Sequence, residues 1–225
     1  MPSESIENYL KAVYELDEAN IPVTTSSLAE KLKISPASVT GMLKRLSTKR
    51  PLLIEYASHQ TPQLTAMGKK TALSIIRQHR LIELFLHKSL DIPWDKLHSE
   101  AEKLEHCVSE YLEDKIDSYL GYPRFDPHGA PIPAKDGSIP PLNYIPLSEL
   151  PTGTESVVKR VMKDDPDLLT YLTKIGLVIG TYITINEIVT FDNTLIVTIG
   201  SSSKSKPTPL GKKIADHIFV ENPAK

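Results

Sequence analysis

Histidine and carboxylate side chains recur at helical spacing between Ile75 and Tyr111. His79 and Glu83 stand four residues apart. A second set, after the break at Asp91-Ile92-Pro93, consists of His98, Glu102, Glu105 and His106. On an α-helix these spacings bring side chains onto one face, where imidazole and carboxylate groups together can coordinate a divalent metal ion. The alternative is a pair of solvated amphipathic helices that carry ordinary surface charges.

The composition limits the class of protein. A chain of 225 residues can form one large domain or two to three small ones, and its net charge of −2 is not that of a polycation. The single cysteine, Cys107, excludes an internal disulfide and fits a reducing compartment. We find neither a signal-peptide core nor an apolar run near the ~18 residues that a membrane helix needs. We therefore expect a soluble, cytoplasmic protein that does not associate with a membrane.

Three helices are predicted in the first fifty residues. They cover about Ile6–Leu16, capped by Ser5, then Thr25–Leu32, and then Pro36–Lys49. Ser35 is a good N-cap for the third helix, and proline is well tolerated at its first position. Two helices joined by so short a link are typical of a helix-turn-helix motif.

The third predicted helix has the features of a DNA-reading helix. Six basic residues and no acidic residue lie between Lys31 and Arg50, which is the local charge that a phosphate backbone attracts. Small polar residues on its early exposed positions would let the helix enter a major groove. The alternative is an ordinary three-helix scaffold with a basic face. The predicted DNA-contacting residues are Thr25, Ser26, Ser35, Pro36, Ala37, Ser38, Thr40, Gly41, Lys44 and Arg45.

Two short strands are predicted directly after this helix. They cover Leu53–Tyr56 and Gln63–Thr65, and a hairpin in this position is typical of the wing of a winged helix. Thr65 can then cap a long helix that begins near Met67 and carries His79 and Glu83.

The region from Asp91 to Asp117 is acidic, with nine acids against three lysines. This favours the uptake of cations, although a plain solvated helix face would have the same composition. Apolar residues interleaved with these charges could bury against a second copy of the chain. A homodimer would place two DNA-reading helices about one turn of double-stranded DNA (~34 Å) apart, which fits a palindromic operator.

The last third differs from the rest in composition and in its predicted secondary structure. Seven prolines from Pro123 to Pro146 predict an extended linker. Strands are expected at Glu155–Met162, Tyr182–Ile188, Leu195–Ile199 and, as an edge strand, Ile218–Val220, with helices at Pro166–Ile175 and Leu210–Asp216. Short strands around one helix suggest a small barrel, so the fold class is mainly α with a small β module.

The sequence resembles the iron- and manganese-dependent transcriptional repressors of the DtxR/MntR family. Its matching motifs are Glu-Asn-Tyr-Leu at Glu7–Leu10, Ser-Pro-Ala-Ser-Val-Thr at Ser35–Thr40, His79-x-x-x-Glu83, and His98-x-x-x-Glu102-x-x-Glu105-His106. The resemblance implies a winged helix-turn-helix domain, a helical dimerisation domain and a C-terminal SH3-like, FeoA-like domain. The boundaries that we predict are 1–70, 71–122, a linker over 123–144, and 145–225.

The resemblance also implies two metal sites. The family's effector site corresponds to Asn8, Glu102, Glu105 and His106. Asn8 stands where other members have methionine or aspartate; as a neutral amide it is a weaker donor, and it would bind through its carbonyl or through a water. A second site corresponds to His79, Glu83 and His98, and Phe125–Gly129 resembles a Cys-Pro-His-Gly motif that adds ligands in some members.

In this motif Asp126 replaces the cysteine and His128 matches directly, although a surface turn would also explain Asp-Pro and His-Gly. Asp165 precedes a predicted helix, so it could cap that helix or reach the second site.

The resemblance implies a metal-dependent repressor of metal-homeostasis genes, not an enzyme. The proposed ligands offer oxygen and nitrogen only, which suits Mn(II), with Fe(II) as the other candidate. Cys107 does not match the family's ligand cysteine, and we interpret it as a core residue. Two alternatives remain: a winged-helix regulator that senses a non-metal signal, and a metal-dependent hydrolase. The hydrolase has little support, because we find no nucleophile elbow, phosphate loop or His-Glu-x-x-His motif.

Overall fold

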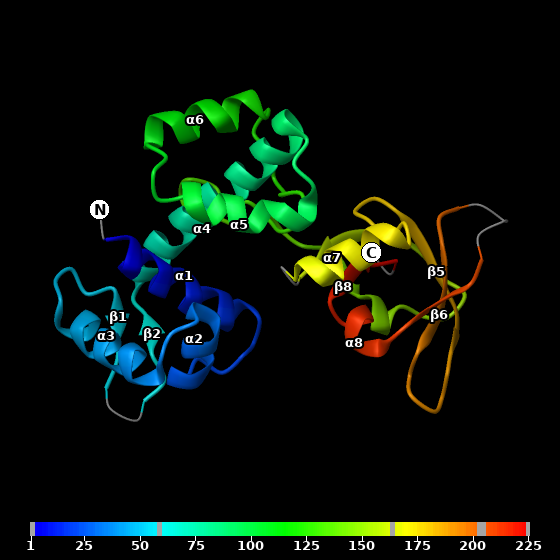
Figure 1. Cartoon of the computed structure of the whole chain (residues 1–225), viewed down its shortest axis with the longest axis horizontal. Coiled ribbons are helices and arrows are strands. Elements are labelled where there is room, and N and C mark those ends of the chain that lie inside the picture. Colours follow the sequence, from blue (N-terminus) through cyan, green and yellow to red (C-terminus); the bar gives the residue numbers. More distant parts are fainter. Residues whose placement is uncertain (1–2, 58–59, 163–164, 202–205, 224–225) are drawn as a thin grey trace. The chain divides into compact units, whose positions relative to one another are not determined.

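The structure is a computed structural model that describes residues 3–57, 60–162, 165–201 and 206–223 (Figure 1). The chain divides into two compact units. The first consists of residues 1–79, 105–108 and 133–138, and the second of residues 80–104, 109–132 and 139–225. Each unit is described by itself.

Three helices and a two-stranded wing make up most of the first unit. They are α1 (Glu4–Glu18), α2 (Thr25–Leu32) and α3 (Pro36–Thr48), as the sequence predicted. Ser35 caps α3 by accepting a 3.2 Å hydrogen bond from the Ser38 amide. Ser5 does not cap α1, because the helix begins at Glu4, two residues before the predicted start, with Ser3 at the N-cap position.

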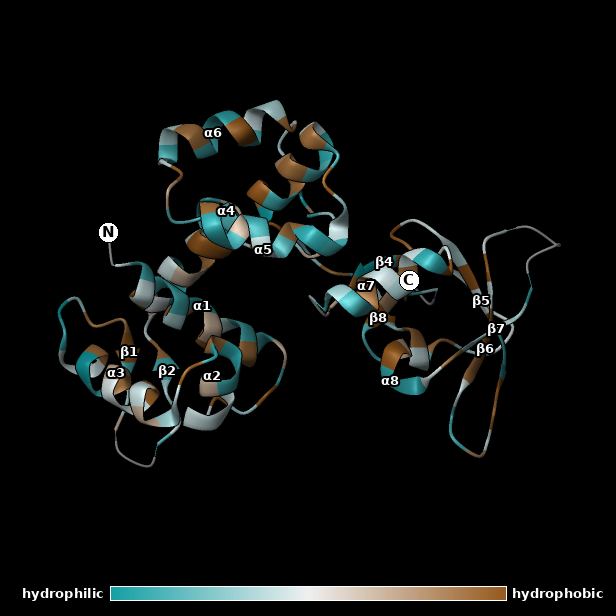
Figure 2. Ribbon diagram, in the orientation of Figure 1, coloured by the Kyte–Doolittle hydropathy of each residue, from teal (hydrophilic) through white to brown (hydrophobic). Residues whose placement is uncertain are grey.

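The wing is shorter than the sequence suggested, with β1 at Ile54–Glu55 and β2 at Gln63–Leu64 in antiparallel register. Thr65 caps the following helix as expected, since its hydroxyl accepts from the Gly68 amide at 3.0 Å. One apolar core fills the space between α1, α2, α3, the wing and the start of the following helix. Brown apolar and teal polar residues interleave along these helices, as in amphipathic helices (Figure 2).

The long helix α4 (Ala66–Leu90) runs from the first unit into the second. It ends at Asp91, whose φ of 53° lies in the left-handed region, and Pro93 precedes α5 (Trp94–Leu104). Helix α6 (Glu110–Tyr119) follows. Leu81, Leu84, Ile116 and Ile132 form the small apolar core of these helices.

The proline-rich segment is held by arginines of α4. Arg77 donates a 2.9 Å hydrogen bond to the Pro133 carbonyl in the first unit. In the second unit, Arg80 donates a 2.5 Å bond to the Pro131 carbonyl. The segment has no helix between residues 123 and 143, as predicted, and these bonds fix it to α4 at two points.

The C-terminal module is a six-stranded antiparallel sheet in the order β3-β8-β4-β5-β6-β7, with α7 (Pro166–Lys174) and α8 (Lys212–Ala215) beside it. Its strands are β3 (Tyr144–Pro146), β4 (Glu155–Val161), β5 (Tyr182–Ile188), β6 (Leu195–Ile199), β7 (Thr208–Leu210) and β8 (Ile218–Glu221). The sheet agrees with the expected SH3-like module.

Two predictions for this sheet were wrong. Strand β8 is not an edge strand, because it pairs with β3 on one side and β4 on the other. Strands β3 and β7 were missed, since each is only three residues long and contains a proline. Within the described residues, no helix is both long and apolar enough to cross a membrane.

Candidate metal centres and nucleic-acid interface

The first candidate centre lies between α1 and the turn that follows α5, both within the first unit. Nε2 of His106 lies 2.9 Å from Oδ1 of Asn8 and 3.4 Å from a carboxylate oxygen of Glu105. Nδ1 of His106 lies 2.8 Å from a carboxylate oxygen of Glu7. Both ring nitrogens of His106 therefore face oxygen acceptors, and Nε2 is the nitrogen that faces Asn8 and Glu105 together.

Glu105 is deeply buried, and two side chains satisfy it. The Lys11 ammonium donates to its two oxygens at 2.9 and 3.1 Å, and His79 contacts it through Nδ1. Lys11 also lies 3.2 Å from this His79 nitrogen. Burial by itself would raise the pKa of Glu105, but bonds and charges from His79 and Lys11 outweigh burial and hold that pKa below its ordinary value. Glu105 is therefore an anion that requires a cation beside it.

Glu105 and His106 are not on the helix that the sequence predicted for them. Helix α5 ends at Leu104, and both residues lie in the turn after it. His98 and Glu102 do lie on α5, in the second unit. There Nε2 of His98 is 3.2 Å from a carboxylate oxygen of Glu102, an exposed side chain. The structure thus brings Asn8, Glu105 and His106 together within one unit, and the place of Glu102 in this centre stays a prediction.

The second candidate centre lies within the second unit and is fully buried. Ligand atoms of Glu83, Asp126 and His128 lie within 4.8 Å of one another. Nδ1 of His128 is 3.8 Å from one oxygen of Glu83, and Nδ1 of His98 is 3.8 Å from the other. Helix α4 supplies Glu83, and the turn from Phe125 to Pro131 supplies the other two ligands.

Asp126 organises its own turn. Its Oδ1 accepts from the backbone amides of His128 at 2.8 Å and Ala130 at 2.9 Å. Burial, together with the Glu83 carboxylate, raises the pKa of Asp126 to about 6, and His128 and Arg80 offset this only in part. Two buried carboxylates and an imidazole in so small a space are a donor set that a divalent cation fits.

Two more predicted ligands have observed partners. His79 lies in the first unit, one helical turn before Glu83 on α4, and contacts Lys11 and Glu105 there. Asp165 is the N-cap of α7 and accepts from the amides of Asp167 at 3.1 Å and Leu168 at 3.4 Å. The capping role predicted for Asp165 is thus present, and its role as a ligand stays a prediction.

The predicted DNA-reading surface is open to solvent. The exposed residues of this surface are Ser26, Ser35, Pro36, Ala37, Ser38, Gly41, Lys44 and Arg45. Two more, Thr25 and Thr40, are half-buried. The inner face of α3 is buried through Val39, Leu43 and Leu46. A helix anchored by one face and exposed on the other can offer its small side chains to a groove.

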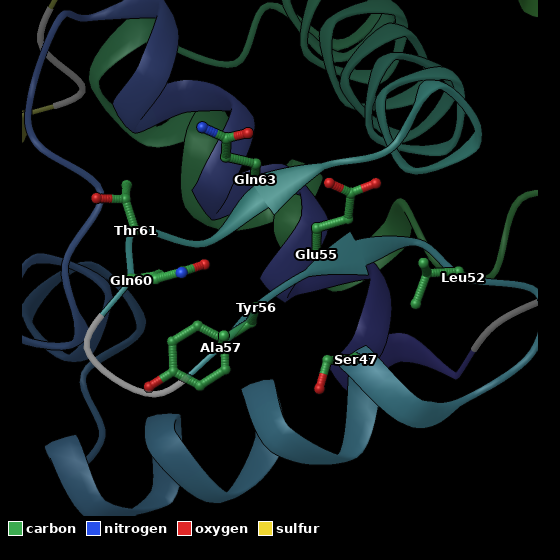
Figure 3. A pocket seen from close by; sticks show the side chains of 8 residues that line it. All are labelled: Ser47, Leu52, Glu55, Tyr56, Ala57, Gln60, Thr61 and Gln63. Atoms are coloured by element: carbon green, nitrogen blue, oxygen red, sulfur yellow. The ribbon is translucent and has the colours of Figure 1, made fainter.

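A hollow of about 660 Å³ lies between α3 and the wing (Figure 3). Its lining combines Ser47 of α3 with the wing residues Gln60, Thr61 and Gln63, all of them uncharged hydrogen-bonding groups. The rest of the lining is Leu52, Glu55, Tyr56 and Ala57. Such groups can bond to phosphate oxygens or base edges, so the hollow extends the candidate interface from the helix to the wing.

Three residues beside the candidate centres were missed by sequence reasoning. Glu7 and Lys11 flank Asn8 on α1, and Trp94 stacks on His128. Lys11 had a signal: it is a charged residue within the stripe of α1 that buries Leu10 and Val13. For Trp94 no signal existed, because its partner lies 34 residues further along the chain.

Comparison with known proteins covers almost the whole chain. The family model for the iron dependent repressor N-terminal DNA binding domain matches residues 1–56. The model for the iron dependent repressor metal binding and dimerisation domain matches residues 65–134. The FeoA domain matches residues 145–222.

Individual relatives agree with these matches. The iron-dependent repressor IdeR of Mycobacterium leprae (strain TN) is 31% identical, over 91% of this chain and 93% of its own. A solved manganese-dependent transcriptional repressor in complex with manganese is 33% identical, with a TM-score of 0.88 over 96% of this chain and 99% of that one. The manganese regulator SloR is 31% identical, with a TM-score of 0.77 over 99% of both chains.

Proposed function

The chain belongs to the DtxR/MntR family of iron- and manganese-dependent transcriptional repressors, and we propose that Mn(II) is the ion that activates it. It is a metal-dependent, DNA-binding repressor, in a family of regulators rather than enzymes. Manganese is favoured because the proposed ligands offer oxygen and nitrogen only, without a sulfur that would suit softer ions. Fe(II) is the second candidate, since several relatives are iron-dependent repressors by name.

The convergence of Asn8, Glu105 and His106 carries the proposal for the effector site. We assign these three residues and Glu102 as its ligands. Glu105 already holds a cation in the form of the Lys11 ammonium, and the bond from Glu7 to Nδ1 orients the His106 ring so that Nε2 faces Asn8 and Glu105. When bound, a divalent ion supplies concentrated positive charge to these oxygen and nitrogen donors.

For the second site we propose Glu83, Asp126 and His128, together with His79, His98 and Asp165. Glu83 and Asp126 are buried carboxylates next to one another, and the raised pKa of Asp126 reflects first its burial and then the negative charge of Glu83 beside it. A divalent ion offsets the cost of both. His79 and Glu83 stand one turn apart on the continuous helix α4.

The DNA-binding mode that we propose is that of a homodimer on a palindromic operator. Residues of the exposed α2–α3 surface, from Thr25 to Arg45, would contact one half-site in each protomer. Large apolar side chains remain exposed on α6 and its ends, among them Tyr111 at 72% and Tyr119 at 69%, and a second copy would cover them. Metal and DNA must then raise each other's affinity by the same factor.

The cellular setting follows from this role. We propose that the protein acts in the cytoplasm on genes of metal homeostasis and has no catalytic activity. We also propose that the division into 1–70, 71–122, 123–144 and 145–225 is the functional one: DNA binding, dimerisation with metal binding, a linker, and an SH3-like module, in that order.

The test is fluorescence anisotropy on DNA from the region upstream of the protein's own gene. Mn(II) is titrated first, then Fe(II) under anaerobic conditions, and each series ends with a chelator. We expect tight binding only with metal, reversed by the chelator, and a loss of at least ~10-fold in metal-dependent affinity for Glu105→Gln. Lys103→Gln, an exposed change two residues away, is the control and should bind as the wild type does. DNA affinity that ignores metal would contradict the proposal.

A further inference from the structure

Trp94 contacts the second candidate centre in two ways and helix α7 in a third. Its indole ring stacks on the ring of His128, with centroids 5.9 Å apart and an interplanar angle of 13°. Its backbone carbonyl lies 3.0 Å from Nε2 of His128. Its indole N–H donates a 2.8 Å hydrogen bond to the Thr173 hydroxyl of α7.

The carbonyl contact decides which nitrogen of His128 can bind a metal. A carbonyl oxygen can only accept, so Nε2 carries the hydrogen, and in a neutral imidazole Nδ1 then keeps the lone pair. Nδ1 is the nitrogen beside Glu83, at 3.8 Å. The bond to Trp94 therefore directs the lone pair of His128 toward the carboxylates of the centre.

The C-terminal module contacts the backbone of this turn as well. The His128 carbonyl accepts from the Val161 amide of β4 at 2.9 Å. Gly129 has a φ of 80°, and a Cβ placed on it would lie 1.8 Å from the Lys159 carbonyl oxygen. Strand β4 thus packs directly against the backbone of the turn, while α7 holds Trp94 through Thr173.

We propose that Trp94 is the positioning residue of the second metal site: it sets the Nδ1-binding tautomer of His128 and couples metal occupancy there to the C-terminal module through Thr173. The inference rests on the proposed second site. It adds that this site reaches full affinity only when α7 holds the indole. Since Trp94 is the only tryptophan in the chain, its emission reports on this position alone.

The test measures Mn(II) binding in a His106→Ala background, which disables the effector site. Free Mn(II) is counted by electron paramagnetic resonance while tryptophan emission is recorded. We expect one Mn(II) per protomer, with a change in emission that follows its binding. Thr173→Val, which removes the hydroxyl and keeps the branched shape, should weaken this binding by about 10-fold and shift the metal-free emission. Thr173→Ser should restore both.

Thr170→Val on the same helix is the matched control, because it leaves the bond between Trp94 and Thr173 in place. Nitrogen-15 spectra of His128, assigned with His128→Gln, should show the Nε2–H tautomer in the metal-free protein. If Thr173→Val has the same Mn(II) affinity and the same emission as the parent, the role of Trp94 is overturned, but the second metal site is not. If no Mn(II) binds in the His106→Ala background, the second site itself fails, and this inference fails with it.

Discussion

Lys11 gives Glu105 a cation even when no metal is bound. Removing one partner of a buried ion pair costs roughly 3–5 kcal/mol, because the other charge is left uncompensated. We therefore expect Lys11→Met to lower the free energy of unfolding by about 3 kcal/mol in a chelator, and Mn(II) to restore more stability in this variant than in the wild type. Chemical denaturation with and without Mn(II) measures both effects.

The matched control for this substitution is Lys31→Met. Lys31 pairs with Glu15 at 2.8 Å near the surface, where such a pair contributes about 0–1 kcal/mol. Equal small losses in the two variants would mean that the Lys11–Glu105 pair does not hold the metal-free centre together.

Asp126 should make the stability of the metal-free protein depend on pH. Its pKa rises from 3.8 to about 6 on folding, so the folded protein holds the proton more tightly than the unfolded chain does. That stabilisation is complete below about pH 4 and is lost as the pH rises through about 6. In a chelator, the free energy of unfolding of the wild type should therefore fall by ~3 kcal/mol relative to that of Asp126→Asn as the pH rises from about 4 to about 7. A difference that stays constant with pH would argue against a raised pKa.

Sequence reasoning was most informative for candidate ligands that recur at helical spacing. The spacing of Glu83, His98 and His106 was enough to single them out as candidate ligands. It could not find Glu7, Lys11 or Trp94, because each is defined by a contact with a residue more than thirty positions away. The place of Lys11 among the buried residues of α1 suggests that it is buried, but it does not reveal that its partner is Glu105.

At the scale of secondary-structure elements, Gly68 determines how closely α4 approaches the wing. A Cβ on Gly68 would lie 1.9 Å from the Leu53 carbonyl oxygen, an atom of the backbone that cannot turn aside. We expect Gly68→Ala to lower the free energy of unfolding by ~1–3 kcal/mol and to weaken DNA binding, because the wing must move. Thermal unfolding and DNA affinity are the measurements.

Gly41 of α3 is the control for this prediction, since nothing lies within 4 Å of a Cβ there. Gly41→Ala should stabilise the helix by ~0.5–1 kcal/mol through its higher helix propensity. If both substitutions stabilise the protein, the contact between Gly68 and Leu53 does not limit packing.

Asp165 allows helix capping to be separated from metal binding. Asparagine caps a helix about as well as aspartate, whereas alanine costs about 1 kcal/mol. We expect Asp165→Asn to keep the stability of the wild type and to weaken Mn(II) binding at the second site, and Asp165→Ala to lose both. Isothermal calorimetry and denaturation together decide this, and unchanged Mn(II) affinity in Asp165→Asn would leave Asp165 as a cap alone.

Elements with strong local signals were predicted from the sequence to within a few residues. Helices α2 and α7 have capping residues at their N-termini. Strands β5 and β6 have alternating apolar residues along their length. The prediction failed where a tertiary contact overrides the pattern. The helical spacing of charges continues to His106, yet α5 stops at Leu104, because Glu105 is bonded to Lys11 and His79.

At the scale of the whole molecule, the net charge of −2 makes DNA affinity depend on one local basic region. Each phosphate contact contributes about −0.9 to the slope of log affinity against log salt concentration. In a dimer, Lys44→Ala should therefore reduce the magnitude of that slope by about 2. Lys88→Ala removes the same charge at the exposed end of α4 and should leave the slope unchanged. Similar slopes for both variants would mean that overall charge, and not the α3 surface, drives association.

The ammonium of Lys11 also affects how long the repressor persists in a cell that lacks its activating metal ion. A regulator whose buried acid depended on the ion alone would unfold and be degraded whenever the ion was lost. With Lys11 in place, the empty repressor persists as a folded reserve. When the activating ion returns, repression then needs only entry of the ion into the cell and not synthesis of new protein.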